Sequence, residues 1–457
     1  MAEHNVTVES TLAVLLEDKK YSTIRDILVT MNPADVAAIF EDMEQETLPL
    51  MFRLLPKELA AETFVEMEPD SQELLIRGFS DSELREVLDE LYADDAADIV
   101  EEMPANVVKR ILAQADPTLR KDINDLLRYP ENSAGSIMTT EYVSLRPSMT
   151  VEEAILRIRR TGVDKETIYT CYVTRDRRLL GLVTVKDLLL ARDDGTLIES
   201  IMEVNVISVN THTDQEEVAR MLSKYNFLAL PVVDSEDRMV GIVTFDDAMD
   251  VMIDEATEDI EIMGGMTPSD KTYLRSNALD LFKHRIPWLM LLMVSATFTG
   301  MIITGFESAL AAQVALTAFI PMLMDTGGNS GSQSSVTVIR AISLGELEFS
   351  DLPRVVWKEI QAAVMCGAAL ACACFVKIML VDRLLMGNDS VTVLVAAVVC
   401  VTMAVTVLVA KVIGCTLPMI ARRLGFDPAV MASPFITTIV DALSLLVYFG
   451  VANALLF

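Results

Sequence analysis

The sequence predicts a multi-domain protein that joins a water-facing N-terminal half, first all-α and then α/β, to an all-α membrane half. Three observations lead to this fold class. Residues 1–270 carry 56 acidic and 25 basic side chains, whereas residues 271–457 carry 11 acidic and 12 basic ones. The middle of the chain contains an internal repeat, and the last third contains long apolar segments. Acidic soluble domains therefore precede a nearly neutral domain suited to a lipid bilayer.

Residues 1–130 are predicted to form an acidic, all-α superhelical domain. Pairs of alanines followed by apolar residues recur three times in this region, and such small residues let short helices pack closely in an array. Asp94, Asp95 and Asp98 form an acidic corner around the third alanine pair. On their own, they indicate a helix N-cap that is stabilised by the helix dipole.

Residues 131–253 contain two copies of one strand–turn–strand–helix pattern. The copies are offset by 60 residues, from Gly181 to Gly241. Because length, order and motif agree in both copies, this region resembles a tandem pair of CBS domains. The resemblance implies a regulatory module that often binds an adenine nucleotide such as ATP, with Asp187 at the ribose hydroxyls. The alternative is that Thr184 caps a helix and Asp187 stabilises its first turn.

An acidic connecting segment, residues 254–284, leads to the membrane half. Between Gly241 and Ile262 there are eight carboxylates and no Lys or Arg. Several of them, including Asp247, Asp250 and Glu258, fall on one helical face. Like charges at this spacing destabilise a helix, and Mg²⁺ or Ca²⁺ would offset the repulsion because hard cations prefer carboxylate oxygens. The alternative is a solvated helix face.

Residues 285–457 are predicted to form a membrane domain of five helices. Each apolar stretch is long enough to cross a hydrocarbon core of about 30 Å, some only with tilt. More basic residues flank one face than the other, which places the N-terminus in the cytoplasm and the C-terminus outside. The five stretches are residues 286–306, 308–325, 357–381, 391–417 and 430–457.

The segment from Pro321 to Ser335 combines glycines with small polar residues, among them Asn329 and Gln333. We expect the second membrane helix to end at its Gly-Gly-Asn. The polar chain beyond would then line a water-filled cavity, because backbone groups at membrane depth must be satisfied. The alternative is a helix C-cap followed by a cytoplasmic loop.

Asp441 is the clearest ionisable residue within a predicted membrane helix, and Thr437 lies one turn before it. Such residues are costly and usually functional. One carboxylate per chain is a poor site for a divalent ion, so we infer a homodimer in which two of them face one ion. Mg²⁺ tends to keep its waters, which favours a wide site for a hydrated ion. Alternatively, Lys411 pairs with Asp441 as a structural bridge.

Several functional classes are disfavoured by the composition. The acidic surface argues against binding to nucleic acid, whose phosphates need Lys and Arg. Neither a nucleophile–base set nor a P-loop is found, and three histidines make a His-ligated metal improbable. The chain is therefore not expected to be an enzyme. Its six cysteines show no disulfide or zinc pattern.

The order of these parts, with Gly327-Gly328-Asn329-Ser330-Gly331-Ser332-Gln333 and Gly425-Phe426-Asp427-Pro428 followed by Pro434, resembles the MgtE family of magnesium channels over nearly the whole chain. The resemblance implies a homodimer in the cell (inner) membrane that conducts Mg²⁺ and is closed by cytosolic Mg²⁺. Transport of Co²⁺ or Ca²⁺, or nucleotide sensing without transport, remain the alternatives.

The resemblance also implies roles for particular residues. Asp441 is the pore carboxylate with Thr437 beside it, Asp427 lies at the cytoplasmic mouth near the connecting or plug helix, and Asn329, Gln333 and Pro434 line the pore. Asn226 departs from the family pattern, which has Asp there. The regulatory metal positions are Glu62, Asp94, Asp95, Asp214, Glu216, Asp247, Asp250, Glu255, Glu258 and Asp259.

Overall fold

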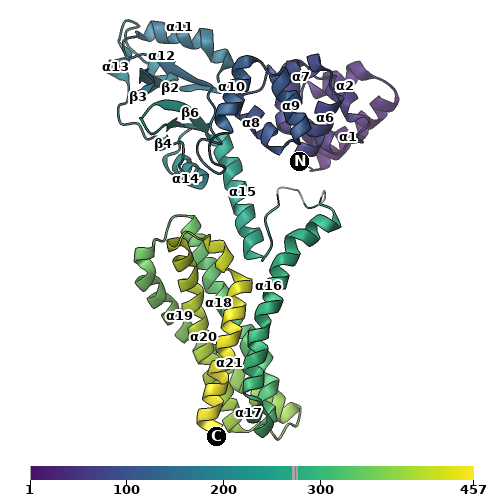
Figure 1. The fold of residues 1–457 in the computed structure, drawn as a ribbon, viewed down its shortest axis with the longest axis vertical. Coiled ribbons are helices and arrows are strands. Elements are labelled where there is room, and N and C mark those ends of the chain that lie inside the picture. The colour runs from purple at the N-terminus through teal and green to yellow at the C-terminus, as the bar shows by residue number, and fades with distance from the viewer. Residues whose placement is uncertain (1, 270–272, 274–275, 457) are drawn as a thin grey trace. The chain divides into compact units, whose positions relative to one another are not determined.

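The computed structural model describes residues 2–269, 273 and 276–456, which divide into two compact units, one up to Met252 and one from Ile253 (Figure 1). The first unit begins with ten short helices. These are α1 (Ala2–Glu17), α2 (Tyr21–Leu28), α3 (Pro33–Glu41), α4 (Leu48–Phe52), α5 (Lys57–Val65), α6 (Pro69–Gly78), α7 (Asp81–Leu88), α8 (Ala93–Glu102), α9 (Ala105–Gln114) and α10 (Pro117–Leu126).

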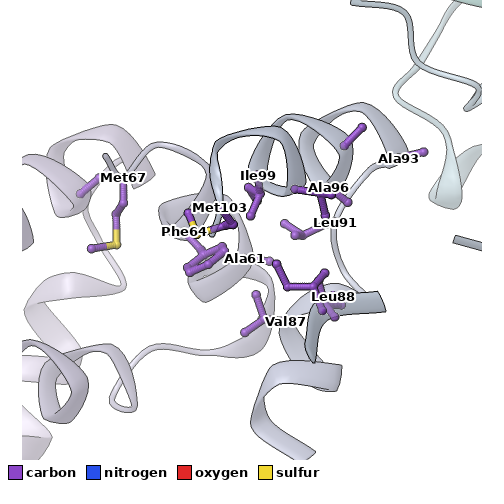
Figure 2. Packing of buried hydrophobic residues seen from close by; sticks show 14 of the residues in the cluster. Ala61, Phe64, Met67, Val87, Leu88, Leu91, Ala93, Ala96, Ile99 and Met103 are labelled. Carbon is purple, nitrogen blue, oxygen red and sulfur yellow. The ribbon is translucent and has the colours of Figure 1, made fainter. Parts of the chain in front are cut away.

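Local sequence signals explain where these helices begin. Ser80 and Glu83 form a capping box at α7, and Asp116 accepts backbone N–H groups at α10. Five of the six alanines of the predicted pairs are buried, and Ala38 is exposed. Figure 2 shows Ala61 and Phe64 of α5 near Val87 of α7 and Ala96 of α8. The predicted array of closely packed short helices is confirmed.

Two three-stranded sheets follow, and they share one topology. In each, the first strand pairs parallel with the second, which pairs antiparallel with the third. The strands are β1 (Tyr142–Leu145), β2 (Thr167–Arg175), β3 (Arg178–Thr184), β4 (Val209–Asn210), β5 (Ala229–Val233) and β6 (Met239–Thr244). The helices are α11 (Val151–Thr161), η1 (Gly162–Asp164), α12 (Val185–Leu189), α13 (Ile198–Ile201) and α14 (Gln215–Tyr225).

The repeated glycines mark where one half of the repeat crosses the other. A Cβ atom on Gly181 would lie 2.7 Å from the Glu203 carbonyl oxygen, and one on Gly241 would lie 2.6 Å from the Thr139 carbonyl oxygen. Only glycine lets the backbones approach this closely. Glycine therefore recurs after 60 residues because each copy of the repeat needs the same close backbone contact.

The acidic helix begins earlier than the connecting segment expected from the sequence. It is α15 (Phe245–Met263), which starts directly after β6 and ends at Gly264 and Gly265. Gly265 has a φ of +72°, which suits a helix terminus. The described residues between this point and α16 are not helical. The boundary at residue 254 therefore stays a prediction.

The second unit is helical. Among the described residues, four helices are long and apolar enough to cross a membrane: α16, the helix from Phe349 to Leu385, α20, and the helix from Pro428 to Leu456. Its elements are α16 (Ala278–Gly305), α17 (Glu307–Ala312), η2 (Val314–Phe319), α18 (Ile320–Ser343), η3 (Phe349–Asp351), α19 (Leu352–Lys377), η4 (Ile378–Leu385), α20 (Val393–Arg423), η5 (Pro428–Met431) and α21 (Ser433–Leu456).

The expectation for residues 308–325 and for the Gly-Gly-Asn segment is wrong. Residues 308–325 form the short α17 and η2 and only the first turns of α18, which then runs unbroken through Gly327, Gly328 and Asn329. Neither glycine has a positive φ, and the left-handed glycine after α18 is Gly345. Both sequence-based interpretations ended the helix too early.

Close packing explains why glycines stand within this helix. Figure 1 shows α18 beside α20 and α21. A Cβ atom on Gly327 would lie 2.7 Å from Thr406 Cγ2, and one on Gly328 would lie 3.0 Å from Thr437 Cγ2. Small residues permit such approach between membrane helices, so these glycines serve packing instead of a turn.

The tightest contact joins α18 to α20 and gives a testable consequence. A Cβ atom on Gly414 would lie 2.2 Å from the Gly331 carbonyl oxygen. Gly414→Ala should therefore destabilise the purified protein by about 1–3 kcal/mol or more, seen as a lower melting temperature in detergent. The control is Gly300→Ala, since nothing lies within 4 Å of that Cβ position. Equal melting temperatures for the two variants would contradict this packing.

Candidate functional site

Asp441 lies on α21, half-buried, within a bundle formed by α18, α20 and α21. Thr437 lies one turn earlier on the same helix, and its hydroxyl donates to the Pro434 carbonyl oxygen at 2.9 Å. Pro434 stands in the first turn of α21, where its fixed φ favours helix initiation. A carboxylate and a hydroxyl oxygen therefore follow one another along one helix.

A polar stripe on α18 runs next to this pair. Asp325, Asn329 and Gln333 lie four residues apart and are exposed in the single chain. The Asn329 side-chain amide donates to Asp325 Oδ1 at 3.1 Å. The approach of Gly328 to Thr437 fixes the register, so that Asp325 and Asp441 lie close enough to interact electrostatically.

Sequence reasoning missed Asp325 as a site residue. The signal that identifies it is its spacing of four residues before Asn329, which places both side chains on one helical face. It was missed because the helix was expected to end at Gly-Gly-Asn. Because α18 is continuous, residues four apart in this segment lie on one face of the helix.

The interpretation that pairs Lys411 with Asp441 is wrong. Lys411 Nζ lies 3.6 Å from Glu359 Oε2 of α19, and it donates to Ser334 Oγ at 3.2 Å. Asp441 is therefore not neutralised by this lysine. Its charge remains available to an ion.

Asp259 and Asp427 form a second acidic position, in the same compact unit. Asp259, near the end of α15, accepts a hydrogen bond from Ser343 Oγ at 3.1 Å. Burial raises its pKa, and the charge of Asp427 adds to this, whereas Ser343 and Arg340 oppose it. Asp427 itself caps η5 by accepting from the Ala429 N–H at 2.7 Å. The end of α15 is thus hydrogen-bonded to the end of α18 and lies near the charge of Asp427 at the start of η5.

A third acidic group lies in the first unit and is larger than the sequence indicated. Asp94 is buried, and its Oδ1 has no hydrogen-bond partner among the described residues. Burial raises its pKa well above the usual value, and Asp95 and Asp247 add to the effect. The N-cap of α8 is Tyr92, so the expectation that Asp94 and Asp95 cap the helix is wrong, whereas their expected place near the positive end of the helix dipole is confirmed. Both stand in the first turn without a side-chain cap bond.

Two further carboxylates belong to this group: Asp98, which the sequence already placed with Asp94 and Asp95 and whose side chain is exposed, and Glu166, which is half-buried. Burial raises the pKa of Asp95 to about 7, with Asp247 adding to it. Burial likewise raises the pKa of Glu166 to about 8, with Asp247 and Asp95 adding to it. Glu166 precedes β2 in a loop, where no periodic signal marks it. We call Asp94, Asp95, Asp98, Glu166 and Asp247 the acidic cluster.

The structure does not bring every predicted metal residue together. In the described part of the chain, no three His, Cys, Asp or Glu side chains are placed to hold a metal ion by themselves. An ion at these positions would need water, backbone oxygens or a second protomer. The remaining predicted residues stand at other points of α5, α14 and α15, with Asp214 as the N-cap of α14; they are Glu62, Asp214, Glu216, Asp250, Glu255 and Glu258.

Two of the sequence-based expectations receive a local structural explanation. Asp187 forms a capping box with Thr184, whose hydroxyl lies 2.5 Å from Asp187 Oδ2. The helix-cap role is thus present, whether or not a ribose also binds. Asn226 ends α14 in the left-handed conformation with a φ of 55°. Asn is favoured there, so Asn226 has a local role in ending α14.

Comparison with known families covers most of these elements. The MgtE intracellular N domain matches residues 31–132, the CBS domain matches residues 134–194 and 198–254, and a family described as divalent cation transporter (MgtE) matches residues 320–451. The magnesium transporter MgtE of Thermus thermophilus is 38% identical over 458 residues, which cover 98% of this chain and 99% of that protein. The chain belongs to the MgtE family.

Other relatives agree with this assignment. The magnesium transporter MgtE of Bacillus subtilis is 32% identical over 97% of this chain and 96% of its own length. A crystal structure of the cytosolic domain of the Mg²⁺ channel MgtE in complex with ATP is 40% identical, covers 53% of this chain and 99% of that chain, and has a TM-score of 0.51. The family and the multi-domain fold class predicted from the sequence are confirmed.

Proposed function

We propose that this MgtE family member is a homodimeric channel that carries Mg²⁺ into the cell and closes when cytosolic Mg²⁺ binds its acidic domains. The observation that carries the proposal is the meeting of Asp441 and Thr437 on α21 with the polar stripe of α18. This arrangement lies within the matched transporter region, residues 320–451. Membership of a transporter family also supports the expectation that the chain is not an enzyme.

The stripe on α18 supports a pore at a two-fold axis. Charged and amide side chains within a membrane face a water-filled path or a protein partner instead of lipid. Asp325, Asn329 and Gln333 are exposed in one chain, so a second chain is needed to enclose them. Two protomers would present four carboxylates around one hydrated Mg²⁺ ion. In this proposal α18 also crosses the membrane, which brings the number of membrane-spanning helices to five.

Basic residues support the proposed orientation. Arg340, Arg422 and Arg423 lie at the ends of α18 and α20, and Arg422 donates to the Ile342 carbonyl oxygen at 3.1 Å. The positive-inside rule places this end, together with Asp259 and Asp427, in the cytoplasm. The C-terminus then lies outside the cell membrane.

The acidic cluster supports closure by Mg²⁺. Asp94 is buried and Asp95, Glu166 and Asp247 are half-buried, and the mutual repulsion of the carboxylates is strongest when they are ionised without a cation. A divalent ion would relieve the repulsion and favour the packed arrangement of helices around it. Ligand binding that prefers one conformation shifts the population toward it. The proposed closed state is the one in which Mg²⁺ bridges these groups, with the pair Asp259 and Asp427 linking α15 to the mouth of the pore.

ATP is proposed as a second regulator, bound by the CBS pair. A cleft of about 290 Å³ lies between the two repeats. Arg178 supplies positive charge there for a phosphate, and Val204 and Val206 supply an apolar wall. Asp187 is not among the lining residues, so its predicted contact with the ribose stays a separate proposal.

Uptake into proteoliposomes tests the proposed function. Purified protein should take up Mg²⁺, reported by a trapped fluorescent indicator, at a rate that falls as Mg²⁺ on the cytosolic face is raised. Co²⁺ and Ca²⁺ in separate runs show whether another divalent ion is preferred. Absence of any divalent flux would favour a sensor without transport.

The stripe gives a specific prediction for Asp325. Removing its charge leaves Asp441 as the single pore carboxylate of each chain, so Asp325→Asn should weaken external Mg²⁺ binding by about tenfold, which corresponds to about 1.4 kcal/mol. The expected change is a higher KM with little loss of maximal flux. The matched control is Asp389→Asn, which alters an exposed carboxylate in the loop before α20. An unchanged KM would exclude Asp325 from the ion path.

A further inference from the structure

Three polar side chains from three helices meet inside the second unit, away from Asp441. Lys411 of α20 donates to Ser334 Oγ of α18 at 3.2 Å, and Ser334 Oγ donates to Glu359 Oε2 of α19 at 2.6 Å. Lys411 Nζ and Glu359 Oε2 are 3.6 Å apart, and the two side chains are only 9% and 18% exposed. We call these residues the Lys–Ser–Glu network.

The network lies within the helices instead of at their ends. At 1.5 Å per residue, its members are roughly 10–18 Å in from the helix termini on that side. Ionisable groups at such depth are costly and are retained for function more often than for stability. A buried ion pair is itself weak support for stability, because the desolvation cost offsets the attraction. A role other than stability is therefore needed to explain it.

The position of Ser334 on α18 indicates that role. At about 100° per residue, Ser334 is roughly 180° around the helix from Asp325 and roughly 140° from Asn329. The network thus holds the side of α18 that is opposite to the polar stripe. The glycines of α18 let the neighbouring helices approach closely. These contacts contain no hydrogen bond, so they restrict the rotation of α18 about its own axis only weakly. Ser334 accepts a hydrogen bond from Lys411 and donates one to Glu359, and both bonds together allow one orientation of the serine side chain.

We propose that Lys411, Ser334 and Glu359 are positioning residues for ion permeation. They hold α18 at the rotation that turns Asp325, Asn329 and Gln333 toward the ion path. This inference rests on the proposed channel function, but the rotation can be measured without any flux.

The test uses the full-length dimer and separates rotation from stability. Glu359→Gln and Lys411→Met each leave one buried group without its charged partner, and each should lower maximal Mg²⁺ flux about tenfold or more. Lys411→Arg should retain most of the flux. The double variant Lys411→Met with Glu359→Leu removes both charges, so its melting temperature should recover while its flux stays low. A purely structural network would instead let flux recover together with melting temperature, and that result would overturn the proposal.

A second readout reports the orientation of α18 directly. Asn329→Cys is introduced, and its modification by a water-soluble thiol reagent is followed for that peptide by mass spectrometry, so the native cysteines do not interfere. Modification should be fast with the network intact and at least about fivefold slower with Glu359→Gln. Lys377→Met, which removes the 2.9 Å ion pair of Lys377 with Asp382 outside the network, is the control and should change neither flux nor modification. Equal modification rates would overturn the proposal, whereas a wild-type protein without Mg²⁺ flux would refute the channel function alone.

Discussion

Asp441→Asn is expected to reduce Mg²⁺ flux by about 100-fold or more. The substitution keeps the size and the hydrogen-bonding capacity of the side chain but removes one negative charge from each protomer. Losing two charges from a site within the membrane should raise the free-energy barrier for a divalent ion by about 3 kcal/mol. Each 1.36 kcal/mol is a factor of ten in rate. The measurement is initial uptake into proteoliposomes, normalised to folded dimer.

A matched control shows that the effect belongs to the charge. Thr402→Val alters another buried polar side chain of the bundle, whose hydroxyl has no hydrogen-bond partner in the described residues. Its flux should stay within about twofold of wild type, and its melting temperature should not fall. If the Asp441→Asn protein keeps its flux, and the Thr402→Val protein conducts as well, Asp441 does not lie in the ion path.

The acidic cluster should make the first unit less stable as pH rises. Carboxylates of an unfolded chain titrate near pH 4. Burial raises the folded-state pKa of Asp95 to about 7 and that of Glu166 to about 8. Between roughly pH 4 and 8 the folded state therefore binds more protons than the unfolded state, so the free energy of unfolding falls as pH increases. Without divalent cations, the melting temperature of residues 1–252 should drop by about 5 °C or more between pH 5.5 and pH 8.

Mg²⁺ should reverse this loss, and most strongly at pH 8, because protons compete with the cation at lower pH. Glu166→Gln combined with Asp95→Asn should raise the melting temperature at pH 8 in the absence of Mg²⁺ and shrink the shift that Mg²⁺ produces. Glu58→Gln changes an exposed carboxylate of α5 and serves as the control. A melting temperature that rises with pH, or a Mg²⁺ shift that survives the double variant, would contradict closure through the acidic cluster.

Much of the fold could be predicted because its signals are local or repeated. The strand and helix limits of the CBS pair follow from alternating apolar residues and from capping residues such as Thr150 and Thr184. The path of α18 could not be predicted from local signals. Its glycines are typical of turns in a single sequence, and only their contacts with Thr406, Thr437 and Ala410 show that they lie within a packed helix.

The residues of the site likewise divide into those that the sequence indicates and those that only the packing reveals. Asp441 and Thr437 stand out because a polar residue within an apolar helix is visible in the sequence. Asp325 and Glu166 do not stand out, because their importance depends on which distant carboxylates lie beside them. The pairing of Lys411 with Glu359 likewise depends on the packing of α18, α19 and α20, and the partner expected from the sequence, Asp441, was the wrong one.

The most direct test of the account is the current carried by Mg²⁺ through the wild-type protein in excised membrane patches, while Mg²⁺ at the cytosolic face is varied. The account predicts channel currents that flow at low cytosolic Mg²⁺ and disappear reversibly as it is raised into the millimolar range, with the Asp441→Asn protein silent throughout. Currents that are indifferent to cytosolic Mg²⁺ would contradict the regulatory role of the acidic domains. Mg²⁺ flux without any current would contradict a channel.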